Sequence, residues 1–113
     1  MPFDFPIDFD AGLCRCGGNR ALYIRFLKRF KDDGSMQALA AAIETGDAKR
    51  AFTHAHTLKG LSAQLGLNAV SFCASRLCGA LRNTHETLPP EAPTLLGELF
   101  SAYAEVLSAI AAL

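Results

Sequence analysis

The chain lacks an excess of charge of either sign. Its 113 residues carry 11 lysines and arginines against 11 aspartates and glutamates, so the formal net charge is zero. A nucleic-acid-binding domain normally needs a basic excess to neutralise phosphates, and a helix that lies on a membrane surface needs a polybasic face. The composition therefore predicts no nucleic-acid partner and no direct membrane contact.

A long uninterrupted apolar run is missing as well. A membrane-spanning helix needs about 20 mainly apolar residues, and the best candidate, from Leu95 to Leu113, is interrupted by Glu98 and Glu105. The N-terminus has no basic region followed by an apolar stretch, so no secretory signal is predicted. We expect a cytoplasmic chain, unless it was cut from something larger.

The four cysteines lack the spacing of a common metal site. One residue separates Cys14 from Cys16, and four residues separate Cys73 from Cys78, whereas a zinc ribbon uses paired C-x2-C motifs. Free cysteine is among the most buried residue types, so packing as reduced thiols is the expected role. An enzyme or metal centre that uses these cysteines and His54 is the weaker alternative, which stoichiometric zinc or iron would revive.

Apolar residues make up 50% of the chain and recur at helical spacing, which predicts an all-α protein with one core. A short helix is expected over Asp8 to Cys16. Four more are expected behind the caps Asn19, Ser35, Asp47 and Asn68, the fourth helix ending near Gly66, and a last one over the stretch from Leu96 to Leu113. A loop is expected from Asn83 to Pro90. Amphipathic helices joined by short loops favour an antiparallel bundle.

The fourth predicted helix carries two histidines that point in different directions. Its core-facing seam is formed by residues spaced 4-3-4-3, namely Ala51, Ala55, Leu58, Ser62 and Leu65. At 100° per residue, His56 points roughly 140° away from the seam, and His54 lies only about 60° off it on the opposite flank. The two imidazoles therefore do not converge on one metal ion, and His54 is interpreted as structural.

The outward neighbourhood of His56 favours a chemical role. Lys59, Gly60 and Ala63 follow on the same face within two turns. Glycine inside a helix costs roughly 1 kcal/mol relative to alanine, and its bare surface leaves the imidazole open to another molecule. A neutral imidazole beside one cation suits a nucleophile that accepts a phosphoryl group. An ordinary solvated helix face is the alternative reading.

The same helix closely resembles the H-x-L-K-G-x5-G signature of histidine-containing phosphotransfer (HPt) domains in bacterial two-component phosphorelays. The matching residues run from His56 to Gly60, with Gly66 further on. A second stretch is similar to the entry region of HPt modules at the C-terminus of hybrid sensor kinases, through Gly12, Leu13, Arg15, Gly17, Gly18, Asn19, Leu22, Tyr23, Phe26, Leu27 and Phe30. With the helix order, the resemblance covers nearly the whole chain.

This resemblance implies a four-helix bundle with one or two additional short N-terminal helices. The single domain would span 1–113, with 1–7 as a lead-in or linker and a bundle core over about 19–113. His56 would accept a phosphoryl group from a receiver-domain aspartate and pass it to a second receiver. Lys59 would steady the phosphoryl group and Gly60 would clear room for the receiver. Such a domain has no kinase activity and no cofactor of its own, since the Mg²⁺ belongs to the receiver.

Response-regulator receiver domains are thus the expected partners, and the binding surface would add Phe52, Ala63 and Gln64 to the histidine face. A small, transient interface is expected. A helical docking module without phosphorylation is the rival function. The chain is expected to be a monomer, either standalone or the cytoplasmic tail of an inner-membrane sensor kinase. The group that orients the His56 imidazole stays open among Ser75, Cys78 and Arg82.

Overall fold

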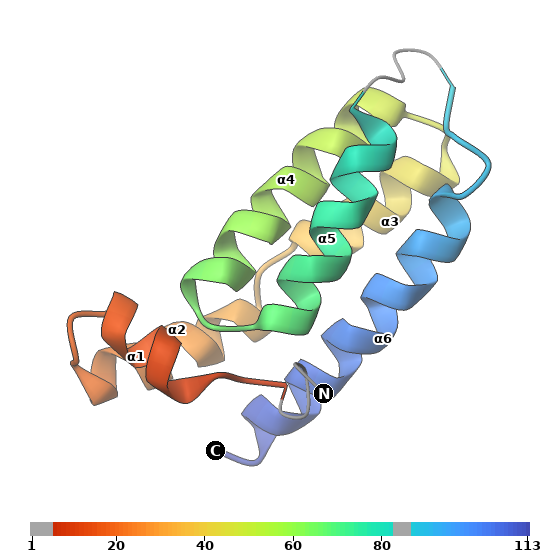
Figure 1. Cartoon of the computed structure of the whole chain (residues 1–113). Coiled ribbons are helices and arrows are strands. Elements are labelled where there is room, and N and C mark those ends of the chain that lie inside the picture. The colour runs from red at the N-terminus through yellow and green to blue at the C-terminus, as the bar shows by residue number, and fades with distance from the viewer. Residues whose placement is uncertain (1–5, 83–86) are drawn as a thin grey trace.

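The structure is a computed structural model that describes residues 6–82 and 87–113. All regular structure in these two ranges is α-helical (Figure 1). The helices are α1 (Phe9–Arg15), α2 (Arg20–Lys31), α3 (Ser35–Glu44), α4 (Ala48–Gln64), α5 (Asn68–Leu81) and α6 (Ala92–Ala111). The all-α prediction is confirmed, and the loop expected from Asn83 to Pro90 lies partly outside the described residues.

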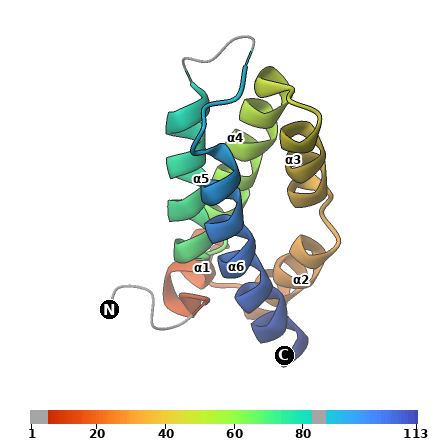
Figure 2. The same cartoon turned by 90° about the vertical axis from the view of Figure 1, so that its right-hand side faces the viewer.

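Four columns of helix form the bundle. α4 packs between α3 and α5, and α6 packs against α5 on one side and against α2 and α3 on the other. α2 continues the column of α3 beyond a short loop, and α1 lies at the end of the bundle (Figure 1, Figure 2). The antiparallel four-helix bundle with a short N-terminal helix is therefore confirmed. Because α4 and α6 are diagonal in this bundle, their outer faces point in opposite directions.

Side chains cap three helix starts, and two of these caps, Asn19 and Asp47, were predicted. The side-chain oxygens of Asp8, Asn19 and Asp47 each accept a hydrogen bond from the backbone N–H three residues further on, at 3.0–3.1 Å. Each bond satisfies one of the N–H groups that a helix start leaves without an intrahelical partner. These caps fix where α1, α2 and α4 begin.

Two other predicted caps are wrong, because Ser35 and Asn68 are the first helical residues rather than the caps. At the start of α3 the Asp33 carboxylate accepts the Ser35 N–H at 2.9 Å, so an upstream side chain satisfies that donor. At the start of α5 the preceding residue is Leu67, which is fully buried. Apolar packing therefore sets this turn, and the polar side chain of Asn68 is not needed as a cap.

The predicted seam of α4 is correct, and buried rows of the same helical spacing run along α5 and α6. The seam of α4 is buried at all five positions, and so are Val70, Ala74, Leu77 and Leu81 on α5. On α6 the row includes Leu99, Val106 and Ile110, and at its start Leu95 is buried whereas Leu96 is half-buried against the core. Leu113, the expected end of the last helix, lies beyond α6 and is 47% exposed.

α6 is long and apolar enough to cross a membrane by length and composition alone, with a mean hydropathy of 1.3. Glu98 and Glu105 were expected to interrupt this apolar run, but they do not lower the mean hydropathy of α6 enough to exclude a span by composition. The face toward the bundle is that of a core helix, since Leu99, Val106 and Ile110 are buried. Only 28% of the most apolar window is buried, although Leu96, Leu107 and Ala109 also pack in part against the core.

The N-terminal segment is tied to the turn between α4 and α5. The Asp8 N–H donates to the Gly66 carbonyl at 2.8 Å, and the Tyr23 hydroxyl donates to the Leu65 carbonyl at 2.6 Å. Gly66 has a φ of +76°, and a Cβ there would lie 2.4 Å from the Asp8 carbonyl oxygen, so only glycine fits. Ile7 is 3% exposed and belongs to the core.

Candidate functional site

α4 presents His56 on its outer face. The seam residues on the opposite side, Ala55 and Leu58 among them, are at most 1% exposed, whereas His56 is exposed. The helix rotation between these positions produces this contrast, as the sequence predicts. His54 is half-buried on the other flank, so the two imidazoles do not share a site.

The contact that holds the His56 ring is an aromatic one. The Phe52 ring, one turn earlier on α4, stacks on the imidazole with a centroid distance of 6.0 Å and an interplanar angle of 20°. Within residues 6–82 and 87–113 the imidazole makes no hydrogen bond. Both ring nitrogens are therefore free to meet a ligand from solvent.

The polar groups considered for orienting this imidazole do not reach it. Cys78 is 1% exposed and faces the core, and neither Ser75 nor Arg82 bonds to the histidine. The stacking of Phe52 on His56 was not predicted, although the spacing of four residues between them was a usable signal.

Lys59 lies on the flank of α4 that faces α5, and its side chain is half-buried. Burial raises the pKa of the Cys78 thiol, and the positive charges of Lys59 and Arg82 partly offset this rise. No salt bridge to Lys59 is found in the described part of the chain. Its ammonium group is thus free to interact with an incoming anion one turn from His56.

The surface beyond His56 is bare. A Cβ added at Gly60 would meet no atom within 4 Å, and the same holds at Gly79 on α5. Ala63 and Gln64 are exposed further along α4, as expected from the sequence. The Gln64 amide donates to the Arg15 carbonyl at 3.3 Å, so its position is set by α1. These residues leave an approach to His56 that no described side chain blocks.

A groove between α2 and α4 adjoins this surface, and sequence reasoning missed it. Its volume is about 570 Å³, and Gln64 belongs both to its rim and to the predicted binding surface. Its apolar lining comes from Phe26, Phe30, Leu61 and Leu65, and its remaining polar lining from Arg29, Asp32 and Asp33. Phe26 is half-buried at the edge of this groove, and the opening beside it depends on how far α2 lies from α4.

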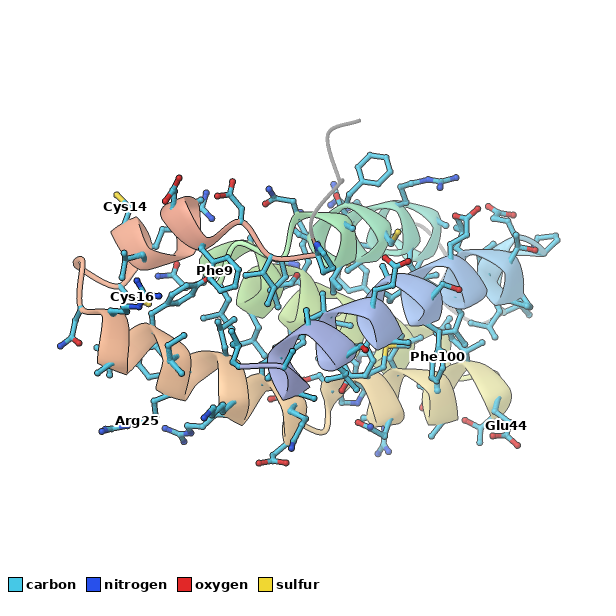
Figure 3. All side chains as sticks on the ribbon, turned by 90° about the horizontal axis from the view of Figure 1, so that it is seen from below. Phe9, Cys14, Cys16, Arg25, Glu44 and Phe100 are labelled. Atoms are coloured by element: carbon cyan, nitrogen blue, oxygen red, sulfur yellow. The ribbon has the colours of Figure 1, made fainter. Side chains whose placement is uncertain are left out.

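The cysteines do not form a cluster. All four are free thiols. Cys14 is exposed on α1 and Cys16 is half-buried just beyond it (Figure 3), and the other two lie on α5. Burial raises the pKa of Cys73 and of Cys78, which favours their protonated forms. No group of three or more potential metal ligands occurs among the residues that the structure describes. The structure therefore does not bring the cysteines and His54 together as a metal site.

Comparisons with known proteins agree with this geometry. The sequence profile of the family described as "Hpt domain" matches residues 25–112. The fold is similar to the crystal structure of the HPT domain of a sensor hybrid histidine kinase from Shewanella, with a TM-score of 0.73 and 23% identity over 96% of each chain. No curated protein gives a significant match. Because the profile covers most of the chain, including α4 and its histidines, the protein belongs to the Hpt domain family of phosphotransfer modules.

Proposed function

We propose that this chain is a phosphocarrier of a multistep His–Asp phosphorelay, with His56 as the phosphoacceptor. The observation that carries the proposal is the exposed imidazole on α4, with a free lysine at one turn and a bare glycine beside it. A family member needs one accessible nucleophile, and the half-buried His54 on the other flank does not meet that need.

The transfer step follows from the chemistry of the two partners. A ring nitrogen of His56 attacks the phosphorus of an aspartyl phosphate on a receiver domain. A P–N bond forms as the P–O bond to the aspartate breaks, and the carboxylate leaves. A second receiver reverses the step when its aspartate takes the phosphoryl group. Positioning supplies most of the rate, because docking converts a bimolecular encounter into an in-line transfer.

Each neighbour has a separate task in this step. Lys59 offsets the negative charge of the phosphoryl group, and Phe52 holds the imidazole plane by stacking. Gly60 and Ala63 let the receiver approach closely. The Mg²⁺ and the catalytic aspartate belong to the receiver, so this chain needs no cofactor of its own. Gln64 and the apolar groove beyond it extend the surface that a receiver can cover.

The setting of the domain is part of the proposal. The entry region from Gly12 to Phe30, similar to that of modules fused to hybrid sensor kinases, favours the cytoplasmic tail of such a kinase over a standalone protein. Partners are then the receiver of that kinase and a downstream response regulator.

Phosphotransfer from a labelled receiver tests the proposal. A panel of receiver domains is phosphorylated with radiolabelled acetyl phosphate and mixed with the wild-type chain, His56→Gln or His54→Gln. We expect an acid-labile, alkali-stable label on the wild type and on His54→Gln, and none on His56→Gln. Equal labelling of His56→Gln would contradict the assignment.

The same assay tests the role of Lys59, and it also tests the rival function of a docking module without phosphorylation. Lys59→Ala should slow transfer by about tenfold or more, or shorten the lifetime of the phosphohistidine, because one charge-assisted contact is worth roughly 1.5–3 kcal/mol. Circular dichroism of the variant should show an intact bundle. Receiver binding without any labelling of the wild type would favour a docking module that carries no phosphoryl group.

A further inference from the structure

α2 carries five of the eleven lysines and arginines of the chain and no acidic residue within its bounds. All five are exposed, namely Arg20, Arg25, Lys28, Arg29 and Lys31. None of their side chains forms a salt bridge with another residue that the structure describes. Asp32 and Asp33 follow directly after the helix, and the Asp33 carboxylate already accepts the Ser35 N–H. We call the five residues the α2 cations.

The stability of α2 explains only part of this charge pattern. Lys28, Arg29 and Lys31 lie in the last turn, where cations interact favourably with the helix dipole. Arg20 lies in the first turn, where the dipole favours an acidic residue and none is present. Arg25 has like-charged neighbours at i+3 and i+4, which destabilise a helix. The charges of Arg20 and Arg25 therefore need a reason outside the helix.

The positive charge of α2 extends from the groove over the outer face of the helix. Arg29 lines the groove that α2 shares with α4. At 100° per residue, Arg25 and Lys28 lie roughly 130–170° around the helix from its buried face. Figure 3 shows Arg25 pointing away from the bundle. Arg25 and Lys28 are thus the α2 cations that a partner can meet without disturbing the core or the groove.

We propose that the α2 cations form an electrostatic rim of the receiver-binding surface and favour receivers with an acidic docking face. This inference rests on the proposed phosphocarrier function. Gln64 lies eight positions after His56, about 12 Å along α4, and also lines the groove beside α2. A small transient interface covers about 600 Å² per partner, a patch about 25 Å across. A receiver centred on His56 therefore reaches Gln64 with its edge and brings its rim toward α2.

The chemistry of a phosphorylated receiver supplies charge of the opposite sign. Its site holds an aspartyl phosphate and a Mg²⁺ ion, and proteins bind Mg²⁺ through carboxylates together with phosphate oxygens. Cations at the rim of an interface mainly raise the association rate of such an acidic partner and leave the contact itself unchanged. A membrane surface fits less well, because the apolar residues Tyr23, Leu27 and Phe30 of α2 are buried in the bundle and cannot enter it.

The salt dependence of phosphotransfer tests the rim. The phosphorylated receiver that labels His56 fastest is used over a range of concentrations, at ionic strengths of about 0.1 M and about 0.5 M. For the wild type, the second-order rate constant of transfer should fall at least about fivefold at the higher ionic strength. Arg25→Gln/Lys28→Gln should lower it about three- to tenfold at 0.1 M and less than about twofold at 0.5 M. The maximal rate at saturating receiver should stay within about twofold of wild type, because the transfer step itself is unchanged.

Ser101→Glu/Ser108→Glu is the matched control, because it changes the net charge by the same amount at two exposed positions of α6, the helix diagonal to α4. Screening over about 10 Å at 0.1 M should leave its rate constants within about twofold of wild type. An equal loss in this control, or no loss in Arg25→Gln/Lys28→Gln, would overturn the proposal. So would unchanged transfer together with lost binding to phosphatidylserine vesicles, which would assign the α2 cations to a membrane surface. Absence of label on the wild type at every receiver concentration would instead contradict the phosphocarrier function, and this inference with it.

Discussion

Gly60 lowers the stability of its helix and leaves the surface beside His56 accessible. It lies one turn after His56, its surroundings are empty, and its backbone is helical, so no conformational need explains a glycine there. An alanine at this position would favour the helix by roughly 1 kcal/mol. Glycine at this position therefore lowers the stability of α4. The proposed close approach of a receiver explains why it is present.

Substitutions at Gly60 should separate stability from transfer. Gly60→Ala should raise the free energy of unfolding by up to about 1 kcal/mol, and Gly60→Leu should keep or raise it. Gly60→Leu should slow phosphotransfer by at least about tenfold, since its side chain fills the space that the partner needs. Urea unfolding and the labelled-receiver assay measure the two effects.

Gly97 on α6 provides the control, because it too is a helical glycine with nothing within 4 Å of a Cβ. Gly97→Leu should change stability in the same direction and leave the transfer rate unaltered. Normal transfer by Gly60→Leu would contradict the clearance role.

Residue directions around α4 could be predicted from the sequence, whereas the contacts of the side chains could not. The rotation of 100° per residue places Ala55 and Leu58 inside and His56 outside, without knowledge of any other helix. The stacking of Phe52 on His56 depends on side-chain rotamers, and the buried environment of Cys78 depends on how α5 packs. The candidates named from the sequence were therefore polar groups, whereas the ring contact that the structure shows is with Phe52.

The connection between α2 and the end of α4 is the clearest element-scale feature. The Tyr23 hydroxyl is buried and donates to the Leu65 carbonyl, and Gly12 of α1 leaves the space that the phenol fills. Burial raises the pKa of Tyr23 to about 12, and nearby Cys16 and Asp8 add to the rise. The folded state therefore holds the proton more tightly than the unfolded chain, whose tyrosines titrate near pH 10.

This shift predicts a pH dependence of stability. A raised folded-state pKa gives stability that is complete below about pH 10 and is lost as the pH rises from about 10 through 12, by roughly 2–3 kcal/mol. Tyr23→Phe should be about 1–2 kcal/mol less stable than wild type at pH 7, because the Leu65 carbonyl loses its partner. The difference should shrink as wild type loses stability above pH 10. Chemical unfolding at pH 7 and pH 11 measures both values.

Tyr103→Phe is the matched control. The Tyr103 hydroxyl is also buried, and burial raises its pKa, but Gln37 lies near it without a hydrogen bond of ordinary geometry. Its removal should cost little at pH 7. An equal loss in both variants at pH 7 would show that the Tyr23 bond to Leu65 adds no stability.

Helix starts could be predicted where a side chain alone decides them, as at Asn19 and Asp47. The prediction failed at Asn68, where the buried Leu67 fixes the turn. The Tyr23 bond could not be foreseen, because its acceptor lies 42 residues away and a backbone carbonyl has no sequence signature.

At the scale of the whole molecule, the N-terminal segment completes the bundle at the end of α4 without belonging to its four columns. Arg15 donates to the Ala63 carbonyl at 2.5 Å, Asp8 bonds to Gly66, and Ile7 is buried in the core. All of these contacts lie near the C-terminal end of α4. Ala63 lies seven positions after His56 on α4, which corresponds to about 10 Å along the axis.

Removal of residues 1–18 should therefore lower stability while sparing transfer. The loss of Ile7 burial and of the hydrogen bonds to α4 should cost on the order of 2–4 kcal/mol, measured by urea unfolding. At a temperature where the shortened chain stays folded, labelling of His56 should be within about threefold of wild type, since one or two rim contacts contribute little to such an interface. Full-length Ile7→Ala, which removes apolar burial alone, should account for only part of the stability loss. Unchanged stability would mean that the segment does not hold the end of α4, and a folded chain that no longer accepts phosphate would mean that α1 belongs to the receiver surface.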